Sequence, residues 1–128
     1  MKNIKYIVIH CSDSPQGRGD DAATIHRWHL ERNWDGIGYH YVILEDGTIQ
    51  AGRPEYWEGS HAYGYNEKSL GICLIGKGDD ATDLQILAAK QLSKGLAYKY
   101  NAEVVGHSSL DTKKPNCPSL DTLKRLRE

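Results

Sequence analysis

The segment Ile4-Lys5-Tyr6-Ile7-Val8-Ile9 is a nearly continuous run of β-branched and aromatic residues. A run of this kind, without regular polar alternation, is typical of an interior strand that is buried on both faces. It ends at His10-Cys11-Ser12-Asp13-Ser14-Pro15, where serine, aspartate and proline stop the strand and open a loop. His10 therefore lies where a buried strand meets the surface, and strand ends are the usual location of a site in open α/β sheets.

Strand-like and helix-like segments alternate along the rest of the chain. We expect helices at 22–32, 82–100 and 120–126, and further strands at 38–44, 48–51, 69–76 and 103–106. Asp46-Gly47 between two β-rich runs predicts a hairpin, and a long loop rich in glycine, aromatic residues and histidine follows over 52–68. The fold class is therefore α/β: one domain spanning 1–128, with a mixed sheet of about five strands, flanking helices and a site in a cleft at one edge of the sheet.

Capping residues fix where the helices begin. Asp20-Asp21 precede the first helix, Thr82 and Gln85 form the capping box of the second, and Ser119 caps the third. The inward face of the first helix is expected to carry Ala22, Ile25, Trp28 and His29, and that of the second Leu84, Leu87, Ala88, Leu92, Leu96 and Tyr100.

The composition excludes several classes of partner. Sixteen basic and seventeen acidic residues leave a net charge of −1, so there is no broad electrostatic attraction to nucleic acid or to an anionic membrane. The longest apolar run is too short to span a bilayer, and no signal peptide is visible, so we expect a protein that is cytoplasmic as synthesised. Three cysteines in such a protein argue against structural disulfides, and Cys73, within an apolar run, is expected to fill the core.

One further stretch carries candidate metal ligands. In 106–119 a histidine, His107, follows a short strand, and Cys117 lies ten positions later across a polar loop. With His10 they form a His-His-Cys set, and three protein ligands with an open fourth position are the pattern of a catalytic zinc. By composition and spacing alone, a surface histidine and an inert thiol explain these residues better.

A set of short motifs in a fixed order is more specific. It comprises Val8-Ile9-His10-Cys11-Ser12, Trp28-His29, Gly38-Tyr39-His40-Tyr41, Asp46-Gly47-Thr48, Ala51-Gly52-Arg53, Gly59-Ser60-His61-Ala62, Ser69-Leu70-Gly71-Ile72, Gly106-His107 and Cys117-Pro118. Together these motifs resemble the zinc-dependent N-acetylmuramoyl-L-alanine amidases of the phage-lysozyme and peptidoglycan-recognition type, over nearly the whole chain.

The resemblance implies one Zn²⁺ per chain, held by His10, His107 and Cys117. It also implies hydrolysis of the amide bond between N-acetylmuramic acid and the L-alanine of the stem peptide, with Tyr39 beside the reacting water. Phage members carry a lysine two residues before the cysteine to stabilise the oxyanion, but this chain has Pro115 there. We therefore expect Lys114 to serve instead, with Lys113 as the alternative.

The resemblance also bears on the long loop and on the other histidines. His61 matches a histidine that lines the family's cleft, and Trp57, Tyr65 and Asn66 of the same loop suit a sugar–peptide ligand. His40 and His29 are expected to pack structurally, and His26 to be exposed. Cys11, next to a ligand, is expected to point away from the metal.

The function that these features imply is a peptidoglycan hydrolase of the endolysin kind, found in a phage or prophage. We expect it to act as a monomer on the cell wall after release or export, with no nucleic-acid or membrane partner. The alternatives are a non-catalytic peptidoglycan-binding module and a regulatory module. Purely binding members of the family typically lack the cysteine ligand, so Cys117 and Tyr39 favour the enzyme.

Overall fold

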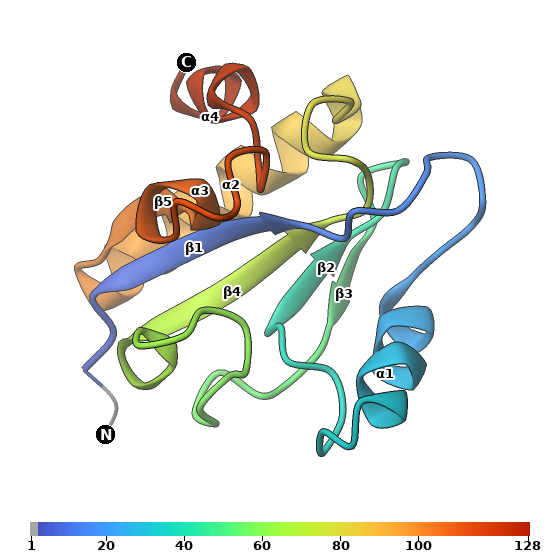
Figure 1. Ribbon diagram of the computed structural model, residues 1–128. Coiled ribbons are helices and arrows are strands. Elements are labelled where there is room, and N and C mark those ends of the chain that lie inside the picture. Colours follow the sequence, from blue (N-terminus) through green and yellow to red (C-terminus); the bar gives the residue numbers. More distant parts are fainter. Residues whose placement is uncertain (1–2) are drawn as a thin grey trace.

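The protein is described by a computed structural model that covers residues 3–128. Its five strands form a single sheet in the order β3-β2-β4-β1-β5, shown in Figure 1. The strands are β1 (Tyr6–Cys11), β2 (Tyr41–Ile43), β3 (Ile49–Ala51), β4 (Ser69–Leu74) and β5 (Glu103–Gly106). The helices are α1 (Ala22–Glu31), α2 (Asp83–Tyr100), α3 (His107–Leu110) and α4 (Leu120–Arg127), and a short 3₁₀ turn, η1, spans Asn66–Lys68.

The sheet is mixed, as the sequence predicts. β1 lies between β4 and β5 and is parallel to both, and β2 is parallel to β4. Only the β2–β3 pairing is antiparallel, and it forms the expected hairpin, with Gly47 at a φ of 88° in the turn. The parallel strands therefore all end at one edge of the sheet, and His10 and Gly106 lie at that edge.

Helices cover both faces of the sheet (Figure 1). One core cluster joins buried residues of β1, β4, α2 and α4, including Ile7, Ile72 and Leu123. A second cluster lies on the other face, where Ile25 of α1 packs with Val42 and Cys73. Cys73 is fully buried, so its expected role as a core residue is confirmed.

The inward face of α2 was predicted in part. Ala88 and Leu96 are buried and Leu92 and Tyr100 pack against the core, as expected, but Leu84 and Leu87 are 55% and 54% exposed, so their predicted inward orientation is wrong. The buried residues of the helix are Gln85, Ile86, Ala88, Ala89, Ser93 and Leu96. Hydrogen bonds of Gln85 explain this difference. Its side-chain amide donates to the carbonyls of Ile43 and Ile75 at 3.1 and 2.8 Å, so the face of α2 that carries Gln85 is directed toward the strand ends. The predicted capping box of Thr82 and Gln85 is present.

The predicted caps of the other helices are confirmed. Asp21 caps α1 and Ser119 caps α4, each through its side chain.

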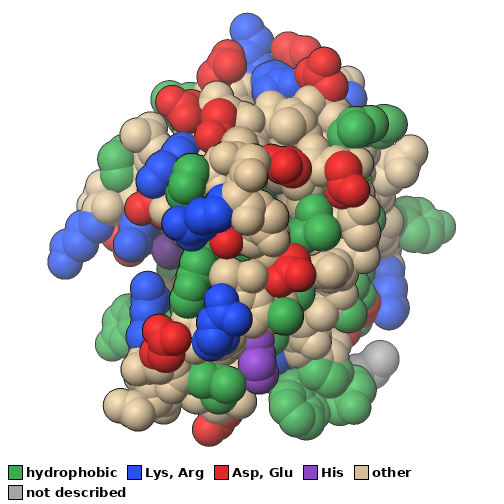
Figure 2. Space-filling view, turned by 90° about the vertical axis from the view of Figure 1, so that its right-hand side faces the viewer, with side chains coloured by type: hydrophobic (Ala, Val, Ile, Leu, Met, Phe, Trp, Pro, Cys, Tyr) green, Lys and Arg blue, Asp and Glu red, His purple; other side chains and the backbone are tan. Residues whose placement is uncertain are grey.

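Two elements differ from those expected. Residues 38–40, which we expected in a strand, precede the shorter β2, and the short helix α3 was not predicted. Among the described residues, no helix is long and apolar enough to cross a membrane. Acidic and basic side chains are interspersed on the face drawn in Figure 2.

Candidate metal centre

The three predicted ligands come together at the carboxyl ends of β1 and β5. His10, near the end of β1, is 1% exposed, and His107 is the first residue of α3, directly after β5. Cys117 lies in the loop before α4. One ligand atom from each residue lies within 4.8 Å of the others. The structure therefore assembles a His-His-Cys cluster from residues that are far apart in sequence.

Local hydrogen bonds hold the two ends of the 107–117 loop together. The backbone N–H of Ser108 donates to the carbonyl of Cys117 at 2.9 Å, and its hydroxyl donates to the carbonyl of Pro118 at 2.9 Å. The Cys117–Pro118 peptide bond is cis. Because Ser108 follows His107 directly, these bonds keep the imidazole and the thiol on the same side of the loop.

Gly78 anchors the same loop from the β4–α2 connection. Its carbonyl accepts hydrogen bonds from the N–H of Ser119 and the hydroxyl of Thr122, both at 2.9 Å. Its φ is 100°, and a Cβ at this position would lie 1.8 Å from the carbonyl oxygen of Asn116. A residue with a side chain would thus push the loop away, so glycine is required here.

The cluster has the features of a zinc site. The Nδ1 atom of His107 is buried and has no hydrogen-bond partner among the described residues. A buried polar atom without a partner is costly, and a metal ion would satisfy it. The Nδ1 atom of His10 lies 4.0 Å from the Cys117 sulfur, and ligand atoms around a tetrahedral zinc are about 3.5 Å apart. Mixed imidazole and thiolate donors also suit Zn²⁺.

The surroundings favour the forms of these side chains that bind metal. Burial lowers the pKa of His10 and of His107, so both imidazoles are neutral near pH 7. Hydrogen bonding with the Cys11 thiol lowers the pKa of the Cys117 thiol, and so does the Cys11 backbone N–H, which donates to the Cys117 sulfur at 3.4 Å. The Cys11 thiol, which lies 3.5 Å from the carbonyl oxygen of Asn116, therefore neighbours Cys117 but is not one of the three clustered ligands.

Tyr39 lies beside this cluster, and the charge of Lys114 acts on it. The rings of Tyr39 and His10 have centroids 5.0 Å apart, and desolvation raises the pKa of the Tyr39 phenol, which therefore keeps its hydrogen. Lys114 is exposed in the loop, and its positive charge contributes to lowering the pKa of all three ligands, His10, His107 and Cys117.

His61 contacts a ligand directly, which its sequence position did not indicate. Its Nδ1 atom lies 2.8 Å from Nε2 of His10, and its Nε2 atom lies 3.3 Å from the Ser69 hydroxyl. His61 belongs to the irregular loop 52–68, so no periodic pattern could have paired it with β1.

The remaining histidines have structural contacts, as expected. His40 is fully buried, accepts from the N–H of Gly71 at 3.0 Å and bonds to the carbonyl of Trp57 at 2.8 Å. His29 is buried and accepts from the N–H of Gly38 at 2.9 Å. His26 is exposed and accepts from the N–H of Ile37 at 3.0 Å.

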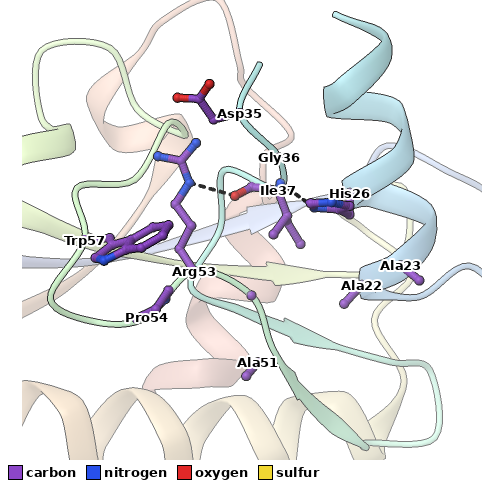
Figure 3. Close-up of a pocket in the computed structure, with 11 residues that line it drawn as sticks. Ala22, Ala23, His26, Asp35, Gly36, Ile37, Ala51, Arg53, Pro54 and Trp57 are labelled. Carbon is purple, nitrogen blue, oxygen red and sulfur yellow. Dashed lines mark hydrogen bonds between the residues drawn. The ribbon is translucent and has the colours of Figure 1, made fainter. Parts of the chain in front are cut away.

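A pocket beside the loop 52–68 contains none of the three ligands. It has a volume of about 440 Å³ and is lined by α1, the end of β3 and Trp57 (Figure 3). Arg53 crosses it and donates to the carbonyls of Ile37 and Glu58. Trp57 is 56% exposed at this pocket. Sequence reasoning had not placed Arg53 or His26 in a pocket, because neither lies at a strand end.

The other two predicted substrate residues have internal contacts. The Asn66 side-chain oxygen accepts from the backbone N–H groups of His61 and Ala62 at 2.8 and 2.9 Å. Tyr65 packs edge-on against Tyr6, with ring centroids 5.7 Å apart. These two residues therefore shape the loop that carries His61.

A mixed α/β sheet with a His-His-Cys cluster at its strand ends is the arrangement of a metal-dependent hydrolase. Residues 1–119 match the family model described as N-acetylmuramoyl-L-alanine amidase, and the chain belongs to this family. It is therefore an enzyme of the amidase family that acts on peptidoglycan.

Known relatives agree with this assignment. The endolysin of Enterobacteria phage T3 is 39% identical over 129 residues, which cover 95% of this chain and 84% of the relative. The endolysin N-acetylmuramoyl-L-alanine amidase LysCS from Clostridium intestinale superposes with a TM-score of 0.88 at 32% identity, covering 98% of this chain and 82% of that one. A mutant of Drosophila PGRP-LB, solved in complex with tracheal cytotoxin, superposes with a TM-score of 0.79 at 30% identity, covering 94% and 78%.

Proposed function

We propose that residues 1–128 form the catalytic domain of a zinc amidase, which hydrolyses the bond between N-acetylmuramic acid and the L-alanine of the stem peptide. The observation that carries this proposal is the cluster of His10, His107 and Cys117, with a buried Nδ1 on His107 that has no partner among the described residues. One zinc ion per chain fits this donor set. When bound, zinc polarises the scissile carbonyl and lowers the pKa of a water molecule toward about 7.

The surrounding residues have separate roles in this reaction. Tyr39, whose phenol keeps its hydrogen near neutral pH, orients the attacking water through a hydrogen bond. Lys114 supplies a positive charge to the oxyanion that forms as the amide carbonyl becomes tetrahedral. The buried His10 and the half-buried His107 and Cys117 form a desolvated base for the site, where electrostatic interactions are stronger than in water.

Peptidoglycan suits the pocket beside the loop 52–68, the loop that also carries His61. Trp57 offers a half-exposed aromatic surface beside the 440 Å³ pocket, which suits stacking on a sugar or packing on a stem peptide. We place Trp57, Tyr65, Asn66 and His61 in the substrate-binding region. Trp57 contacts the substrate, whereas Tyr65, Asn66 and His61 shape the wall of this region. The protein is proposed to act as a monomer on the cell wall after release or export from the cytoplasm.

A non-catalytic peptidoglycan-binding module is the second candidate function. Its specific support is that the relatives include recognition proteins, and that PGRP-LB has a solved complex with tracheal cytotoxin. A binding module requires no complete ligand set, whereas this chain keeps Cys117 among the ligands and Tyr39 beside His10. The catalytic proposal therefore explains more of the site.

Digestion of purified peptidoglycan tests the reaction. The protein loaded with zinc should release muropeptides whose free N-terminus is L-alanine, identified by mass spectrometry, without new reducing sugar ends. New reducing ends without free L-alanine would identify a glycosidase and contradict the proposal. Binding to the wall without any new ends would favour the recognition module.

Two variants separate metal binding from chemistry. Cys117→Ser should lose both bound zinc and activity, because a hydroxyl is a poor ligand for this ion. Tyr39→Phe should keep about one zinc per chain and lose about 100-fold or more in kcat, because only the hydroxyl that orients the water is removed. Full zinc content in the Cys117→Ser protein would remove Cys117 from the site.

A further inference from the structure

His61 contacts the cluster through one of its ring nitrogens but is not one of the three clustered residues. One of its ring nitrogens lies 2.8 Å from His10, and the other lies 3.3 Å from the hydroxyl of Ser69. The Ser69 hydroxyl in turn donates to the carbonyl of Tyr65 at 2.7 Å. Ser69 is fully buried at the start of β4. These contacts form one continuous series of hydrogen bonds from the proposed metal ligand His10, through His61 and Ser69, to the backbone carbonyl of Tyr65.

With both imidazoles in their neutral form, the backbone carbonyl at the end of this hydrogen-bonded series determines the direction of each hydrogen bond in it. A backbone carbonyl only accepts, so the Ser69 hydroxyl must donate its single hydrogen to Tyr65. Ser69 then accepts from Nε2 of His61, which must carry the hydrogen of that ring. Nδ1 of neutral His61 is consequently a bare acceptor, and Nε2 of His10 donates to it. The hydrogen of the neutral His10 ring is thereby assigned to Nε2.

The consequence for the cluster is a specific form of His10. With its hydrogen on Nε2, the ring has its lone pair on Nδ1, the atom that lies 4.0 Å from the Cys117 sulfur. We propose that His61 is a positioning residue, which with Ser69 holds His10 in the form whose Nδ1 is open to the metal. This inference rests on the proposed zinc site, and it gives His61 a role other than substrate contact.

The backbone around His61 is shaped to hold its ring in place. A Cβ on Gly71 would lie 2.7 Å from the His61 ring, and a Cβ on Gly59 would lie 2.6 Å from it. The ring therefore occupies a slot between two glycines, where a larger neighbour would displace it. Both ring nitrogens of His61 already have partners within the protein. This arrangement suits a residue that positions His10 better than one that binds substrate.

The first test is nuclear magnetic resonance of the metal-free protein with ¹⁵N-labelled histidine. We expect the ring hydrogen of His10 on Nε2, with a ¹⁵N–¹⁵N coupling across the hydrogen bond to Nδ1 of His61. Ser69→Ala should weaken this coupling, because the group that orients His61 is gone. A His10 hydrogen on Nδ1, or a wild-type protein without the coupling, would overturn the proposal.

The second test is zinc affinity, measured by competition with a chromogenic chelator. His61→Leu should bind zinc about 10- to 100-fold more weakly, as is typical when a partner behind a metal ligand is removed. His61→Asn, which restores an acceptor for His10, should recover part of this loss, and Ser69→Ala should show a smaller loss. Ser93→Ala is the matched control, since Ser93 is also buried but donates to the carbonyl of Lys90 within α2, away from the cluster.

The failures of the two proposals can be told apart. Wild-type zinc affinity in His61→Leu would assign His61 to substrate contact or packing, and so would overturn this inference while leaving the amidase intact. A wild-type protein that binds no zinc would overturn the proposed function as well. If His61→Leu does not fold, the wild-type spectrum and the Ser69→Ala variant still decide the question.

Discussion

Lys113 and Lys114 occupy the middle of the loop between the ligands His107 and Cys117. The backbone N–H groups of both lysines bond to Asp111, that of Lys113 to the side chain and that of Lys114 to the carbonyl. The charge of Lys114 contributes to lowering the pKa of all three ligands, and this electrostatic effect favours Lys114 over Lys113. Pro115 occupies the position at which the phage pattern has its lysine.

Alanine substitutions at the two lysines should have unequal effects. Lys114→Ala should lower kcat about 10- to 100-fold with zinc content unchanged, because the oxyanion loses its positive partner. Lys113→Ala is the matched control and should stay within about twofold of wild type. Equal losses in the two variants, measured by muropeptide release, would contradict a specific role for Lys114.

The three ligands were assigned through the family resemblance, and a simple geometric rule agrees with two of them. His10 and His107 each follow an apolar run, and the carboxyl ends of parallel strands meet at the same edge of a sheet. Cys117 follows no strand and was assigned through the family resemblance. The contact between His10 and His61 could not be predicted, because the path of an irregular loop depends on packing and not on a repeating pattern.

Among the secondary-structure elements, α2 shows what the spacing of apolar residues predicts correctly and what it does not. Its length, its capping box and the inward position of Leu96 were predicted correctly, but Leu84 and Leu87 were wrongly assigned to the buried face. Apolar spacing alone favoured Leu84 and Leu87, whereas the structure uses the polar Gln85 to satisfy two strand-end carbonyls. The spacing of apolar residues cannot predict that a polar residue such as Gln85 is buried to form hydrogen bonds.

Replacing Gln85 should therefore destabilise the fold. Gln85→Ala removes the amide donor from the carbonyls of Ile43 and Ile75, of which Ile43 still accepts from the N–H of Ile75, and it removes half of the capping box, so we expect a loss of ~1–3 kcal/mol in the free energy of unfolding. Gln91→Ala, at an exposed position of the same helix, should change it by less than about 0.5 kcal/mol. Urea unfolding measures both, and equal effects would show that Gln85 contributes only helix propensity.

For the molecule as a whole, buried neutral histidines make stability depend on pH. Burial lowers the pKa of His29 to about 4, whereas a histidine in the unfolded chain titrates near 6.5. Between these values the unfolded state binds more protons, so the free energy of unfolding falls as pH falls through this window. The lowered pKa values of His10 and His107 act in the same direction.

We expect the metal-free protein to lose up to ~3 kcal/mol through His29 alone between pH 7 and pH 4. Urea unfolding at pH 7, 5.5 and 4.5 should show a progressive decrease, because protonated Nδ1 no longer accepts from Gly38. His29→Gln should flatten this dependence. Stability that is constant or rises on acidification would contradict the assignment.

The order of the ligands along the chain also has a consequence for biosynthesis. His10 is translated early, and its partner Cys117 is 107 positions later, after every strand of the sheet. A nascent chain that stops before Cys117 has at most two of the three ligands and lacks the loop that Gly78 anchors. A product of translation that stops before Cys117 therefore contains no complete hydrolytic centre, and the proposed activity appears only after Cys117 has left the ribosome.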